Sequence, residues 1–139
     1  MRVSLAGLRR IAGRLLQKVG CPKDSLSVLL LTDRRIRSLN RLYLRHDDAT
    51  DVLAFEGGAG FLGDIAISLD TAKRQAARYG NSFAYELAFY LCHGILHLRG
   101  YRDGTKKEAD KMLQKQARLL QSIGVRNSKW RSRKPKPSF

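Results

Sequence analysis

Two histidines in the second half of the chain are the residues best placed for chemistry. His93 and His97 lie four positions apart in the run CHGILHLRGYRD. On a helix this spacing puts both imidazoles on one face, one turn apart, where their nitrogens can reach a single metal ion. Gly100 then allows a sharp turn that can bring Asp103 back toward the same point. Two histidines and one carboxylate form a catalytic zinc set that leaves a fourth position for water.

The same histidines also have a simpler interpretation. Imidazoles at this spacing on an apolar helix can be ordinary core side chains with internal hydrogen bonds. The glycine break and the acid that follows it favour the metal, so we predict one zinc ion bound by His93, His97 and Asp103. Cys92 is adjacent to the first histidine and points away from it on a helix, so we expect a buried thiol there rather than a ligand.

Two further positions on this helix bear on the kind of chemistry. Metalloproteases with the HExxH motif place a glutamate, the general base, directly after the first histidine. Here that position is Gly94, which disfavours a zinc peptidase. Glu86 lies two turns before His93 on the same face. It can orient the His93 ring through a hydrogen bond or act as an ordinary buried polar partner, and the sequence leaves both open.

A long apolar helix must position the histidines. Ser82 can cap its start, Gly100 stops it, and the residues between them are apolar on most sides. We therefore predict a buried central helix that carries the metal-binding histidines and ends near Leu98.

The other elements follow from hydrophobic periodicity and from the glycines that interrupt it. Helical spacing predicts four more helices, over residues 5–19, 33–43, 69–79 and 106–123. Short β-prone runs predict strands over residues 25–31, 50–55 and 63–68, the first of them buried. The glycines between the last two strands indicate an antiparallel hairpin. The predicted fold class is α/β: a small single domain with one mixed β-sheet covered by helices.

The composition fits one globular domain with a strongly basic surface. The chain has 139 residues, 43% of them apolar, which suffices for a single core. Its net charge of +15 favours a polyanionic partner, most economically a nucleic acid, over a charge that serves solubility alone. No apolar run is long enough for a membrane helix, and two cysteines without CxxC spacing fit a reducing cytoplasm. The oligomeric state is left open.

Basic charge is densest at the C-terminal end. Residues 126–139 contain six arginines and lysines, two prolines and no acid. We therefore predict a folded domain over residues 1–125 followed by a basic, disordered tail over residues 126–139. Trp130 within this tail can stack on an unpaired base, or the tail is only a solubilising extension.

The run that contains the histidines resembles a known signature. HGILHLRGYRD is similar to the HGxLHLxGYDH motif of the YbeY endoribonucleases, the bacterial rRNA maturation factors. Upstream, the LN, TDVLAF and LGDIAIS runs resemble the family's LN, TDVLSF and LGDIxIS, and an EL pair before the histidines also matches. The resemblance extends from about Ser25 to Ala117, and these motifs together are far more specific than HxxxH alone.

This resemblance implies a zinc-dependent, single-strand-specific endoribonuclease. It implies a role in small-subunit rRNA maturation and ribosome biogenesis, with an rRNA precursor and the small ribosomal subunit as partners. The family's first two metal ligands carry over onto His93 and His97. The third is usually a histidine and here is Asp103, a competent zinc ligand. The only other histidine, His46, is a weaker candidate for that third position.

One departure concerns the residue that would bind phosphate. Many members of the family have an arginine directly after the tyrosine of the LNxxY segment, where this chain has Leu44. The next residue is Arg45, and we assign the catalytic, phosphate-binding role to it, with Arg41 and Arg99 as alternatives. In this hypothesis zinc lowers the pKa of bound water to roughly 7, and the arginine holds the phosphate.

Two other functions stay open at the level of sequence. A non-catalytic ribosome-assembly or RNA-binding protein with a structural metal would explain the missing third histidine and the basic tail. Structural zinc, however, normally has four protein ligands, and only three good candidates are evident. A zinc peptidase would share the HxxxH spacing, but Gly94 and the strong positive charge argue against it.

Overall fold

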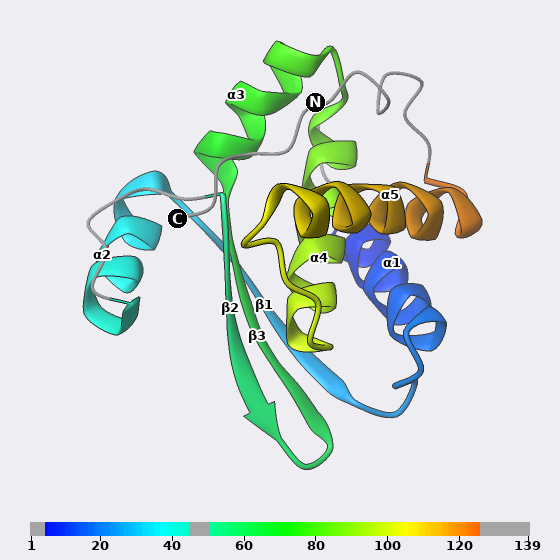
Figure 1. Cartoon of the computed structure of the whole chain (residues 1–139). Helices are drawn as coiled ribbons and strands as arrows, with labels where there is room; N and C mark the ends of the chain where they lie inside the picture. Colours follow the sequence, from blue (N-terminus) through cyan, green and yellow to red (C-terminus); the bar gives the residue numbers. More distant parts are fainter. Residues whose placement is uncertain (1–4, 45–50, 126–139) are drawn as a thin grey trace.

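The computed structural model describes residues 5–44 and 51–125, which form five helices and three strands (Figure 1). The predicted α/β class is confirmed, and the largest difference in bounds is at the second strand, which ends three residues later than predicted. The elements in chain order are α1 (Leu5–Lys18), β1 (Ser25–Leu31), α2 (Asp33–Leu44), β2 (Val52–Gly58), β3 (Phe61–Ser68), α3 (Leu69–Tyr79), α4 (Phe83–Leu98) and α5 (Lys106–Ser122).

One mixed sheet holds the three described strands in the order β1-β3-β2. The central β3 pairs in parallel with β1 and antiparallel with β2, so the predicted mixed sheet and hairpin are both confirmed. The hairpin turns at residues 59–60, and Gly57 and Gly58 extend β2 instead of forming the turn. β1 is not the buried strand that we predicted, because it lies at an edge and Leu29 is 43% exposed. A short apolar run carries no local feature that distinguishes an edge strand from a central strand of the sheet.

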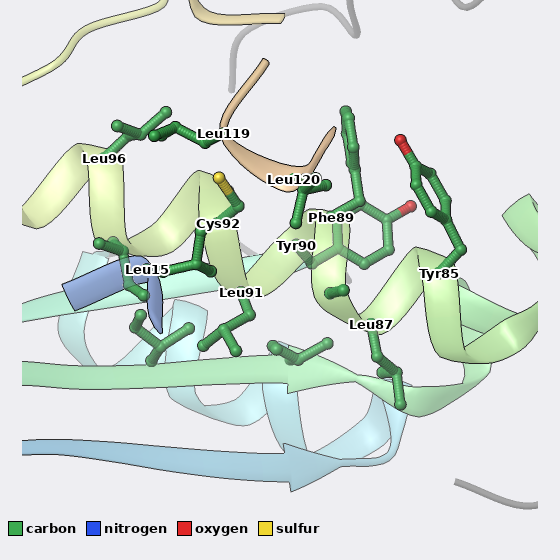
Figure 2. Packing of buried hydrophobic residues seen from close by; sticks show 14 of the residues in the cluster. Leu15, Tyr85, Leu87, Phe89, Tyr90, Leu91, Cys92, Leu96, Leu119 and Leu120 are labelled. Carbon is green, nitrogen blue, oxygen red and sulfur yellow. The ribbon is translucent and has the colours of Figure 1, made fainter. Parts of the chain in front are cut away.

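Helix α4 is the buried centre of the domain, as predicted. The Ser82 side chain caps its first turn by accepting a hydrogen bond from the Tyr85 amide at 3.0 Å. Figure 2 shows Leu87 and Leu91 pointing toward the strands, while Leu120 of α5 lies on the other side of the helix. The last two turns of α4 are therefore held between the sheet and α5, and this fixes the direction in which their polar side chains project.

The remaining helices cover both faces of the sheet. α1 and α5 pack against α4, and α2 lies on the opposite face, where Ile36 is buried against Leu53 and Ala66 (Figure 1). Leu42, which its spacing places on the apolar face of the same helix, is 71% exposed. Within the described ranges, none of the helices combines the length and apolar character needed to cross a bilayer.

A polar network joins the N-termini of α2 and α3. One carboxylate oxygen of Asp33 accepts hydrogen bonds from the Ser68 and Thr71 hydroxyls, and the other accepts from Arg74 at 2.8 Å. In the opposite direction, the Asp33 amide donates to the Asp70 carboxylate at 2.8 Å. Burial acts to raise the pKa of Asp33, but the hydrogen bonds and the Arg74 charge outweigh it, and the pKa lies below its usual range. Each helix start is thus tied to an acid of the other helix.

Candidate metal centre

The last two turns of α4 carry His93 and His97, and the segment after the helix carries Asp103. The Nε2 atoms of the two histidines are 3.0 Å apart, and each lies 3.4 Å from the Asp103 Oδ2. All three side chains are partly exposed, so solvent can reach the point where they meet. The structure brings together the three residues that the sequence singled out, and as a group they could hold a metal ion.

A tight turn at Gly100 explains how Asp103 returns to the histidines. Gly100 has a φ of +95°, a backbone conformation that residues with a side chain rarely adopt. The chain reverses here, and the Tyr101 amide donates to the Leu96 carbonyl at 3.0 Å. The Tyr101 carbonyl then lies 3.0 Å from His97 Nδ1. The turn therefore supplies both the acid and a support for the second histidine.

The first histidine is held from α5 by Gln116. The Gln116 side chain is fully buried, with its Oε1 3.0 Å from His93 Nδ1 and its Nε2 donating to the Phe89 carbonyl at 3.2 Å. A backbone carbonyl can only accept hydrogen bonds. The amide nitrogen must therefore face Phe89, and the amide oxygen must face His93.

These two supports decide where the imidazole protons lie. Both supporting oxygens only accept, so Nδ1 of each neutral ring donates to its support. The two Nε2 atoms then carry lone pairs that point toward each other and toward the Asp103 carboxylate. Electron-rich atoms this close repel one another unless a cation lies among them. Donor atoms of a tetrahedral zinc site with bonds of about 2.0–2.1 Å are about 3.3 Å apart, close to the observed 3.0 and 3.4 Å. The donor set therefore fits zinc.

The electrostatics keep these donors in the form that binds cations. Burial is the largest influence on His97 and, together with the neighbouring His93, lowers the pKa of its imidazole despite opposing contributions from Asp103. The pKa of Asp103 is also lowered, first by its contact with His93 and also by the nearby His97, while burial opposes the shift. At neutral pH the site therefore presents a neutral His97 ring and an ionised carboxylate.

The residues directly before and after His93 are both packed in the core. Burial raises the pKa of the Cys92 thiol to about 12, so this residue is the buried thiol that we predicted. A Cβ at Gly94 would lie 2.8 Å from the Ile65 side chain, so α4 rests directly on β3 at this point. Position 94 has no room for the glutamate of an HExxH protease, which strengthens the sequence argument against a peptidase.

Gln116 is the site residue that the sequence analysis did not identify. It falls on the apolar stripe of α5, between Met112 and Leu120, and a polar residue on such a stripe was the available signal. Glu86, considered as a support for the first histidine, instead accepts a hydrogen bond from Asn81 at 2.7 Å. Of its two interpretations, the structure favours the ordinary buried polar partner.

The candidates for phosphate binding, and His46 as the alternative third metal ligand, lie in different parts of the chain. Arg45 and His46 lie outside the described residues, so their assigned roles stay predictions. Arg41 is exposed on α2, on the face of the sheet opposite α4. Arg99 is exposed at the end of α4, where its charge acts on the Cys21 thiol. We therefore keep Arg45 as the predicted phosphate-binding residue.

Comparison with known proteins identifies relatives of this chain. The family model described as Endoribonuclease YbeY matches residues 4–124. The protein named Endoribonuclease YbeY of Anaeromyxobacter dehalogenans is 46% identical over 123 residues, which cover 85% of this chain and 64% of that protein. The protein of the same name from Syntrophotalea carbinolica is 39% identical over 132 residues, 88% of each chain.

A solved structure is also similar. The solution structure of a Thermotoga maritima protein superposes with a TM-score of 0.65 at 28% identity, covering 92% of this chain and 84% of that one. The lengths differ among relatives: the chain spans 64% of the first two relatives, both from Anaeromyxobacter, and 88% of the Syntrophotalea protein.

Proposed function

The chain belongs to the YbeY endoribonuclease family, and we propose that it is a zinc-dependent endoribonuclease that hydrolyses single-stranded RNA. His93, His97 and Asp103 hold one zinc ion in this proposal. The observation that carries it is the convergence of two imidazole Nε2 atoms and a carboxylate oxygen, with an acceptor oxygen beside each Nδ1 on the far side of the rings.

The chain's own residues bind and orient in this mechanism. Bound zinc supplies Lewis acidity toward water and phosphoryl oxygens at neutral pH. The two histidines are neutral, so Asp103 supplies the negative charge of the site. This charge offsets part of the double positive charge of the zinc ion. Gln116 and the Tyr101 carbonyl hold the two rings in place, and Arg45 is proposed to bind the phosphate of the RNA.

The number of donors favours catalysis over a structural metal. Among the residues that the structure describes, the candidate group contains three side chains and not the four of a closed structural site. The partial exposure of all three leaves access for a substrate oxygen. A non-catalytic assembly protein with a structural zinc is therefore the weaker candidate.

The proposed substrate and partners follow from the family and the charge. The relatives are named endoribonucleases, and a net charge of +15 suits a polyanionic substrate. We propose an rRNA precursor as the RNA, the small ribosomal subunit as partner, and action in rRNA maturation and ribosome biogenesis in the cytoplasm. We also propose that residues 1–125 form the nuclease domain and that the basic residues 126–139 add phosphate contacts.

Metal content and RNA cleavage test the central proposal together. We expect the purified full-length protein to contain one zinc ion per chain and to cleave a single-stranded RNA but not the matching duplex. A chelator should abolish cleavage, and His97→Ala should lose both metal and activity. Gln114→Ala, an exposed change on α5, is the control and should keep both. Cleavage that survives both chelation and His97→Ala would contradict the proposal.

A further inference from the structure

Gln116 is a polar residue where packing alone would favour an apolar one. It is fully buried on the face of α5 that otherwise contributes Met112, Leu119 and Leu120 to the core. A buried amide costs free energy unless its polar atoms are hydrogen-bonded, whereas a methionine of similar length carries no such cost. The reason for an amide at this position must lie in the contacts of its two polar atoms.

Both of those atoms contact α4, one turn apart. Nε2 donates to the Phe89 carbonyl at 3.2 Å, and Oε1 accepts from His93 Nδ1 at 3.0 Å. Phe89 and His93 are four positions apart, so the amide bridges the helix backbone and the imidazole of the next turn. The backbone contact sets the direction of the amide oxygen, and the amide oxygen sets the position of the imidazole proton.

We propose that Gln116 is a positioning residue, which holds His93 in the Nδ1–H tautomer and aims its Nε2 lone pair at the metal. The inference rests on the proposed metal site. Without this support the ring could rotate or move its proton to Nε2, and either change removes a lone pair from the site.

The two histidines differ in what supports them. His97 is held by the Tyr101 carbonyl, which belongs to the turn that directly follows its own helix. His93 is held by a side chain 23 positions away, on a different helix. Metal binding is therefore coupled to the packing of α5 on α4 through His93.

Gln116→Met removes the amide with little change in shape. We expect the metal-free protein to keep its free energy of unfolding or to gain slightly, because a buried polar group is lost and the Phe89 carbonyl still accepts within the helix. Zinc affinity, measured by titration of the full-length protein, should fall about 10- to 100-fold. Gln114→Met is the matched control, exposed on the same helix, and should change neither quantity.

Nitrogen-15 NMR of the imidazoles reads the tautomer directly in the metal-free protein. At about pH 8, where imidazoles are neutral, wild-type His93 should show a protonated Nδ1 and a lone pair on Nε2. In Gln116→Met the Nε2–H form of His93 should appear, while the His97 signals stay unchanged. A purely structural role for Gln116 would alter stability without moving the His93 tautomer.

The outcomes separate this inference from the proposed function. Wild-type His93 protonated at Nε2 would overturn the role of Gln116, and so would unchanged zinc affinity in Gln116→Met. A wild-type protein that binds no zinc would instead contradict the metal site. In that case the tautomer in metal-free protein still decides whether Gln116 orients His93.

Discussion

Two carboxylates, Asp33 and Asp103, each sit at the meeting point of separate elements but have opposite surroundings. Asp33 accepts from two hydroxyls and a guanidinium, so a donor proton lies between its oxygens and each of these three groups. Asp103 faces two imidazole nitrogens whose protons lie on the far side of the rings. The hydrogen bonds of the first cluster are made within the protein, whereas the second cluster offers three acceptor atoms that could bind a cation.

Burial would not have told these two acids apart. The Asp33 side chain is 27% exposed and the Asp103 side chain 34%, and both have lowered pKa values. The difference lies in the identity of the contacting atoms: donors around Asp33, acceptors beside Asp103. Counting proton donors and lone pairs around a carboxylate thus separates a structural network from a candidate metal site.

Replacing Asp103 with alanine should produce the largest effect, a loss of zinc affinity. Asp103→Ala removes a proposed direct ligand, so zinc affinity should decrease by about 100-fold or more, beyond the loss typical of an indirect support. The metal-free protein should unfold at nearly the same denaturant concentration, because the substitution also relieves repulsion among acceptors. Isothermal titration with zinc and urea unfolding of metal-free protein measure the two quantities. Full zinc affinity in Asp103→Ala would remove this residue from the ligand set.

Alanine at Asp33 should reverse that pattern. Asp33→Ala leaves the buried Ser68 hydroxyl and the Thr71 hydroxyl without their acceptor, which should lower the free energy of unfolding by about 2–3 kcal/mol. Zinc affinity should not change. Urea unfolding and zinc titration of this variant, beside Asp103→Ala, complete the comparison. The distinction between the two clusters would fail if both variants showed the same loss of unfolding free energy and the same loss of zinc affinity.

Alanine at Gly100 should have an intermediate effect on the metal cluster. The positive φ there would cost a non-glycine residue about 1–2 kcal/mol. The strain should also shift the Tyr101 carbonyl and Asp103, so zinc affinity should fall about 10-fold. Gly13→Ala on α1 is the matched control, since a Cβ there meets nothing within 4 Å. It should leave zinc affinity unchanged and stabilise the helix by about 0.5–1 kcal/mol.

The smallest effect is the pH dependence of the Asp33 network. Its folded pKa is lowered, so its contribution to stability is present above the unfolded value of about 3.9 and is lost as pH falls through the folded value. The difference in unfolding free energy between wild type and Asp33→Asn should therefore be constant from about pH 7 to 5 and shrink below about pH 4. Denaturant unfolding at a series of pH values measures it. A difference that grew on acidification would show that the sign of the shift is wrong.

Much of the candidate metal centre could be predicted because its parts are close in sequence. Helical periodicity places His93 and His97 on one face, and a glycine after the helix permits the turn that returns Asp103. The relative positions of these three residues depend only on local backbone geometry over eleven residues, and the structure brings them together as expected. The buried character of α4 followed similarly from its lack of a polar face.

The remaining features depended on contacts between distant segments. The edge position of β1 follows from β3 pairing with both other strands, which no local pattern in β1 records. The same holds for Gln116, whose partner lies on another helix, and for the Asp33 network, whose partners lie 35 to 41 positions away. The sequence by itself determined which atoms could bind a metal. Only the tertiary structure decided which way their lone pairs point, because the groups that hold the imidazole protons come from the Gly100 turn and from α5.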